Sequence, residues 1–246
     1  MASLQQSNSP STLQAARNEP APPAIALSNV TRVFGSAPAV VRATVSIERG
    51  ECVLVRGANG AGKSTLLRVI ATVLSPTYGS GTVLGHDLVT GREEIRPRIE
   101  FLGHRTRLYD DLTGRENLAF VCSMYGIDPS GLDGAIDRVG LSGSADDRVR
   151  HYSHGMRQRL AVARALVRRP DVLLLDEPYA GLDDEAKALV DWMIEEARRD
   201  GRTVMLATHD VSRGAAADRV LFMEAGRILP DFAFSSSQET HQRITP

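Results

Sequence analysis

The fold is decided by the stretch Gly57-Ala58-Asn59-Gly60-Ala61-Gly62-Lys63-Ser64-Thr65. It satisfies the pattern G-x-x-x-x-G-K-[ST] and lies between an apolar run and a helical pattern, as a phosphate-binding loop requires. Glycines let the backbone wrap closely around a phosphate, and the start of the next helix adds its positive dipole end. Lys63 would reach the β- and γ-phosphates, and the Ser64 hydroxyl would bind Mg²⁺. The stretch therefore predicts a nucleotide site, with a chance glycine-rich turn as the alternative.

A second motif, VLLLDEP at residues 172–178, ends a buried-strand pattern with two carboxylates. Ligands collect at the carboxyl ends of strands in open α/β sheets. Asp176 is the expected partner of Mg²⁺, and Glu177 could act as a general base that polarises a water for attack on the γ-phosphate. The alternative is a helix N-cap followed by a charged turn, which the phosphate loop makes the weaker interpretation.

A third motif, YSHGMRQRL at residues 152–160, gives Ser153 two compatible roles. Its side chain could cap a helix whose apolar residues follow at helical spacing. An exposed Ser-X-Gly at a helix start, completed here by Gly155, is also suited to bind an anion.

Strand and helix patterns alternate along most of the chain. Apolar or β-branched runs predict strands over residues 25–34, 40–47, 51–56, 172–175, 203–207 and 220–223. Helical patterns cover residues 63–74, 115–125, 132–139, 155–168, 184–199 and 211–216. We therefore expect an α/β sheet core with a helical insertion between its early and late strands.

The composition of the 246 residues fits one folded domain, expected over residues 24–230. Residues 1–23 predict a disordered arm and residues 231–246 a loose tail, because both are polar and without apolar periodicity. The net charge of −1 argues against a partner that is a nucleic acid. Neither a membrane-spanning run nor a secretory signal core is present, and the two cysteines match no disulfide or metal pattern. We expect a chain that is cytosolic or peripheral on the cytosolic side of a membrane.

Taken in order, the motifs resemble those of the ATP-binding subunits of ABC transporters. After the phosphate loop come a Q-loop-like segment at 101–118, a signature-like YSHGM at 152–156, the Asp176–Glu177 pair, AGLD at 180–183 and ATHD at 207–210. The resemblance covers residues 25–228. It implies a P-loop NTPase fold with a mixed or parallel sheet core, an N-terminal antiparallel β part and a helical subdomain over about residues 105–168.

The resemblance also implies a dimer, of identical or different subunits, that encloses two ATP molecules. Ser153 and Gly155 would contact the γ-phosphate bound by the partner subunit, and Asp183 would cross the interface. His209 would contact the γ-phosphate and hold the attacking water, with a structural role as the alternative. Phe34 matches the aromatic residue that stacks on adenine in the family, with core packing as the alternative.

Two of the motifs depart from the family's pattern. His104 stands where the family has a glutamine that touches Mg²⁺ and the water; an imidazole can coordinate a metal but offers no amide oxygen. His104 is therefore either a metal-site residue or a bystander at the mouth of the insertion. In the signature, His154 and Met156 replace a glycine and a glutamine. Loss of their polar contacts would fit slow hydrolysis or a non-identical partner.

The function implied by the resemblance is that of a motor subunit, which hydrolyses ATP with Mg²⁺ to drive a separate membrane-spanning permease. Residues 101–118 are similar to export-type members, especially the ATPase subunit of the haem exporter of cytochrome c maturation. A soluble cassette ATPase acting on nucleic acid or ribosomes is one alternative, although its usual second cassette or coiled coil is missing. A P-loop kinase is another, but it leaves the signature, AGLD and ATHD motifs unexplained.

Overall fold

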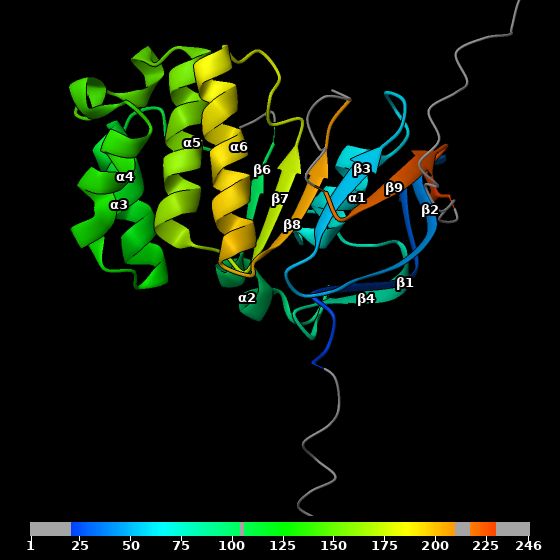
Figure 1. Ribbon diagram of the computed structural model, residues 1–246. Coiled ribbons are helices and arrows are strands. Elements are labelled where there is room, and N and C mark those ends of the chain that lie inside the picture. The colour runs from blue at the N-terminus through cyan, green and yellow to red at the C-terminus, as the bar shows by residue number, and fades with distance from the viewer. Residues whose placement is uncertain (1–20, 104–105, 210–216, 230–246) are drawn as a thin grey trace, which may run out of the picture.

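The computed structural model describes residues 21–103, 106–209 and 217–229, which form two sheets and a helical part (Figure 1). The larger sheet has six strands in the order β10-β9-β3-β8-β7-β6. All neighbouring strands in it are parallel except for the short edge strand β10. Its strands are β3 (Cys52–Arg56), β6 (Ile99–Leu102), β7 (Val172–Asp176), β8 (Thr203–Ala207), β9 (Arg219–Glu224) and β10 (Arg227–Ile228).

The smaller sheet is antiparallel and has the strand order β2-β1-β4-β5. Its strands are β1 (Ile25–Phe34), β2 (Ala37–Ile47), β4 (Tyr78–Val83) and β5 (His86–Asp87). Helix α1 (Lys63–Ile70) shares one hydrophobic cluster with both sheets: its Leu66 and Leu67 belong to the cluster that also contains Val53 of β3 and Ile25 of β1. The expected N-terminal antiparallel part is confirmed.

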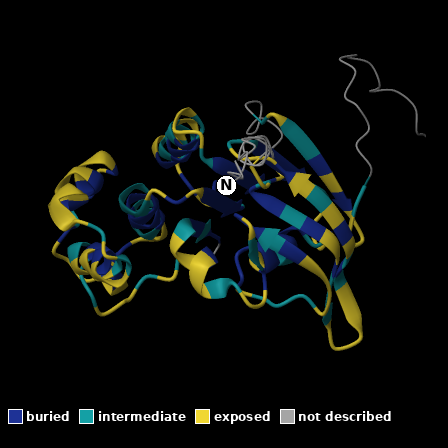
Figure 2. Ribbon diagram, turned by 90° about the horizontal axis from the view of Figure 1, so that it is seen from below, coloured by how far each residue is buried: buried dark blue, intermediate teal, exposed yellow. Residues whose placement is uncertain are grey.

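Helices α5 (His154–Arg168) and α6 (Asp184–Arg199) lie against the opposite face of the large sheet, and α3 (Gly114–Tyr125) and α4 (Leu132–Arg138) pack on the outer side of α5 (Figure 1). The short α2 (Arg92–Ile95) precedes β6. In β7, Val172 and Leu174 belong to the hydrophobic cluster of α1, whereas Leu173 and Leu175 belong to a second hydrophobic cluster, which includes residues of α3, α4, α5 and α6. The central strands are thus buried on both faces, as their continuous apolar runs predict. Figure 2 shows buried residues on the inner sides of the helices and exposed residues on the outer sides.

Differences from the predicted elements have local causes. The predicted helix over residues 63–74 ends at Ile70, and Thr72 two residues later has a φ of 55°, which an α-helix excludes. Strands β4, β5, β6 and β10 and helix α2 were not predicted, because they are short or, in β4, rich in Gly and Ser. The predicted helix 211–216, and most of the predicted arm and tail, lie outside the described residues. Within the described part of the chain, no helix is long and apolar enough to cross a membrane.

Candidate nucleotide-binding site

The phosphate loop connects β3 to α1 at the edge where the parallel strands β3, β7 and β8 all end (Figure 1). At two of its glycines, the neighbouring backbone leaves no room for a side chain. A Cβ atom at Gly57 would lie 2.2 Å from the Met223 carbonyl oxygen, and one at Gly62 would lie 2.3 Å from the Ala39 carbonyl oxygen. Gly62 also has a φ of 103°, which favours glycine. The loop is therefore pressed against neighbouring backbone, while Ala58, Asn59 and Gly60 at its tip are exposed.

Lys63 is the first residue of α1, and its side chain is only 6% exposed. Its Nζ atom donates hydrogen bonds to the carbonyl oxygens of Gly57, at 2.7 Å, and Ala58, at 3.1 Å. The ammonium group thus lies across the mouth of the loop. The first turn of α1 holds no acidic residue, so the positive end of the helix is not neutralised locally. Both features suit a loop that takes up a phosphate group.

Ser64 and Asp176 come together from α1 and from the end of β7. The Ser64 hydroxyl donates a hydrogen bond of 2.7 Å to Oδ1 of the buried Asp176. A guanidinium nitrogen of Arg68 lies 3.9 Å from Oδ2 of the same carboxylate. Among the described residues there is no cluster of three His, Cys, Asp or Glu side chains that could bind a metal. One hydroxyl and one carboxylate nevertheless fit Mg²⁺, which takes one or two carboxylates and completes its shell with substrate phosphates and water.

Glu177 and His209 form a second pair beside Asp176. Oε2 of Glu177 lies 2.9 Å from Nδ1 of His209. The parallel register explains this contact, because Asp176 of β7 is opposite Ala207 of β8, which places the residues after each strand end side by side. The Glu177 side chain is partly exposed and the His209 side chain is 71% exposed. Both groups can therefore reach a ligand and water at this edge.

Ser153 and Gly155 lie at the start of α5, in the helical part of the molecule. Ser153 is the N-cap residue, and its Oγ atom accepts a hydrogen bond of 3.2 Å from Met156 N, so the predicted capping role is confirmed. Asp183 caps α6 in the same way, accepting from Ala186 N at 2.8 Å. In the described part of this single chain, none of these three residues forms a hydrogen bond with the phosphate loop. Their phosphate-binding and interface roles stay predictions.

Two further predicted residues have different outcomes. Phe34 is 45% exposed, so the alternative that it packs in the core is wrong. The guanidinium of Arg32 lies 4.7 Å from the centre of its ring. His104, the predicted metal-site residue, lies outside the described residues.

The sequence analysis did not predict two residues that support the site. Arg68 lies near Asp176, and the Ala207 carbonyl accepts a hydrogen bond of 2.8 Å from the backbone N–H of Glu177. For Arg68, the only available signal in the sequence was its position five residues after Lys63 on the same helix. For the Ala207 carbonyl, the local sequence held no signal, because its hydrogen bond depends on the pairing of β7 with β8.

Comparison with known proteins agrees with this geometry. Residues 40–180 match the family described as ABC transporter. The ABC transporter ATP-binding protein NatA of Bacillus subtilis (strain 168) is 36% identical over 228 residues, covering 89% of this chain and 93% of NatA. The Nod factor export ATP-binding protein I of Rhizobium meliloti is 34% identical, covering 83% of this chain and 62% of that relative. Relatives of comparable identity are named for import.

A solved structure is similar over most of the chain as well. The dimeric structure of a post-hydrolysis state of the ATP-binding cassette MJ0796, bound to ADP and Pi, superposes with a TM-score of 0.75 at 26% sequence identity. The match covers 83% of this chain and 96% of that one. The fold agrees with that of this solved structure, and the chain belongs to the family of ABC transporter ATP-binding proteins.

Proposed function

We propose that this chain is the ATP-hydrolysing motor subunit of an exporter, acting as a dimer at the cytoplasmic face of a membrane on a separate permease. The observation that carries the proposal is that two contacts, Ser64 with Asp176 and Glu177 with His209, lie side by side at one edge of the sheet. They lie next to the phosphate loop, whose backbone is bound by Lys63. ATP binding and hydrolysis are the chemistry of the family.

Each group at the edge has a distinct role in this proposal. Lys63 would exchange its two carbonyl partners for the β- and γ-phosphates. Mg²⁺ would be held by Ser64 and Asp176 and would offset the charge that develops on the phosphates. Glu177 would accept the proton of the attacking water, and His209 would orient that carboxylate through the contact at 2.9 Å.

The remaining predicted residues belong to a second subunit's site in this proposal. Ser153 and Gly155 start a helix at an exposed position, and Asp183 is exposed one helix away. The solved dimer named above supports such an assembly. Phe34, exposed at the end of β1, would stack on the adenine of the chain's own ATP. The relative named for Nod factor export supports the export direction.

The catalytic assignment is tested by Glu177→Gln, with Glu195→Gln on the exposed face of α6 as the matched control. Positioned base catalysis contributes about 10²–10⁴-fold, so kcat should fall at least about 100-fold while ATP binding persists. An ATP-dependent dimer should then accumulate in light scattering. Unchanged turnover in Glu177→Gln would refute the role of the base.

The partner is tested by purifying the tagged chain from native membranes. A co-purifying protein with several membrane-spanning segments is the expected result. Recovery with ribosomes or nucleic acid instead would favour the soluble alternative, and transport into the cytoplasm by the recovered complex would contradict export.

A further inference from the structure

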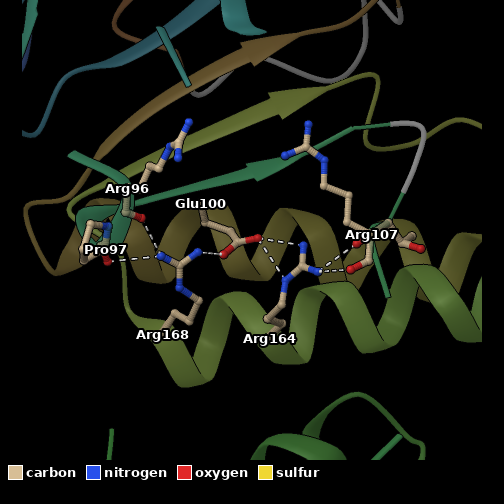
Figure 3. Close-up of polar contacts among 7 residues, drawn as sticks. Arg96, Pro97, Glu100, Arg107, Arg164 and Arg168 are labelled. Atoms are coloured by element: carbon tan, nitrogen blue, oxygen red, sulfur yellow. Dashed lines mark hydrogen bonds and ion pairs between the residues drawn. The ribbon is translucent and has the colours of Figure 1, made fainter. Parts of the chain in front are cut away.

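A buried charge cluster is formed between β6 and α5 by residues that are not part of the candidate nucleotide-binding site. Glu100 on β6 is 3% exposed, and both of its carboxylate oxygens are bound by arginines of α5 (Figure 3). Arg164 approaches Oε1 with Nε at 3.0 Å and a terminal nitrogen at 2.7 Å, and Arg168 donates to Oε2. A carboxylate with this little exposure is stabilised only when its partners stay in place.

The same two arginines also hold the backbone on both sides of β6. Arg164 donates to the carbonyl oxygens of Thr106, at 2.8 Å, and Arg107, at 3.4 Å. Arg168 donates to the carbonyl oxygens of Arg96, at 2.9 Å, and Pro97, at 3.1 Å. Figure 3 shows these contacts extending from the α5 arginines toward both ends of the strand. Glu100 therefore orients two guanidinium groups. In each, a terminal nitrogen that does not bind Glu100 donates to the backbone, after β6 for Arg164 and before β6 for Arg168.

The far end of β6 lies directly against the candidate site. Leu102 is opposite Leu175 in the parallel register, one residue before Asp176. A Cβ atom at Gly103 would lie 3.7 Å from Cβ of Asp176 and 3.0 Å from the ring of Phe101. Gly103 thus lies against the Asp176 side chain, and Arg164 holds the backbone at Thr106, three residues further along the chain. Helix α5, which carries that arginine, begins at the Ser153 cap.

We propose that Glu100 is a positioning residue for ATP hydrolysis. Its carboxylate orients Arg164, and Arg164 fixes Thr106 and Arg107, which follow closely after Gly103, the residue that lies beside Asp176. The proposal rests on the assignment of Asp176 to the nucleotide site. A misplacement of about 1 Å can cost about 100-fold in rate, so loss of the cluster lowers kcat and leaves the affinity of the phosphate loop for ATP unchanged.

The first test compares Glu100→Gln with Glu51→Gln. Glu51 is a matched control, because it is also poorly exposed (17% for its side chain) and is bound by Arg219 Nε at 2.8 Å, but on the β9 side of the sheet. Glu100→Gln should lower kcat about 10- to 100-fold with KM for ATP within about twofold. Amide hydrogen exchange should become faster at Thr106–Leu108 and stay unchanged at Lys63–Leu67. Equal effects of both variants on kcat, or unchanged exchange at Thr106–Leu108, would overturn the proposal.

A second test separates positioning from the stability of buried charges. The triple variant Glu100→Leu, Arg164→Met, Arg168→Met removes the whole cluster, and such replacements are often neutral or stabilising. It should regain the unfolding temperature lost in Glu100→Gln but not the lost kcat. Recovery of kcat in the triple variant would show that the cluster acts only on stability, which overturns the proposal.

If Glu100→Gln fails to fold, Arg164→Lys takes its place. Lysine keeps a cation for Glu100 but cannot reach the carboxylate and two carbonyl oxygens together, because it lacks the planar fork. The same fall in kcat and the same faster exchange are expected, and wild-type values would overturn the proposal. The exchange measurement needs no nucleotide, so its result is independent of whether the site assignment itself holds.

Discussion

Replacing Gly62 with alanine tests whether the phosphate loop is shaped by contact with neighbouring backbone. Gly62 has a φ of 103°, and an added Cβ atom would lie 2.3 Å from the Ala39 carbonyl oxygen. Gly60 in the same loop has a φ of 80° but nothing within 4 Å of its added Cβ atom. Gly60→Ala therefore carries only the conformational cost of the left-handed region, about 1–2 kcal/mol. Gly62→Ala carries the same cost plus overpacking of about 1–3 kcal/mol.

The difference between the two variants isolates the contact with Ala39. In a domain of this size about 1 kcal/mol shifts the unfolding temperature by roughly 2–4 °C, so Gly62→Ala should unfold about 2–12 °C below Gly60→Ala. Differential scanning calorimetry without nucleotide is the measurement, because bound ligand would add its own stabilisation. Equal unfolding temperatures would show that the loop can move away from Ala39, which would refute the argument that its shape is fixed by packing.

Three further predictions concern separate parts of the molecule. Lys63→Ala should abolish most ATP binding measured by calorimetry while circular dichroism stays unchanged, and parental affinity would contradict the loop assignment. Ser153→Ala should lower the free energy of unfolding by about 1 kcal/mol in urea titrations, because Met156 N loses its cap; an unchanged midpoint would contradict that role. Burial raises the pKa of the Cys52 thiol to about 11 from 9.0, so the unfolded chain ionises first and stability should fall as pH rises from 9 toward 11. Cys52→Val should remove that part of the slope in urea unfolding, and parallel slopes would exclude Cys52 as its source.

The structural features that could be predicted from the sequence are those that depend on residues adjacent in the chain. The phosphate loop needs glycines and a lysine at fixed spacing, the carboxylate pair follows a run of leucines, and the Ser153 cap precedes its helix directly. Each of these depends on interactions within a few residues, so the local pattern carries the information.

The contacts that could not be predicted join residues far apart in the chain. Arg164 and Glu100 are 64 residues apart, and β6, which holds Glu100, is too short for a clear strand pattern. The pairing of Glu177 with His209 depends on the register between β7 and β8, which neither strand specifies alone. For Phe34 the type of residue alone left core packing open as the alternative, and the structure shows that the side chain is exposed.

The backbone of Glu177 shows that this edge of the sheet is not arranged for stability alone. Its φ of 52° is a left-handed conformation in which a glutamate costs free energy that glycine or asparagine would largely avoid. The conformation is held by the hydrogen bond from its N–H to the Ala207 carbonyl, so the neighbouring strand keeps the turn from relaxing. Glycine at position 177 would lower this cost but would remove the carboxylate that lies 2.9 Å from Nδ1 of His209, so a gain in folding stability there opposes the proposed catalytic role.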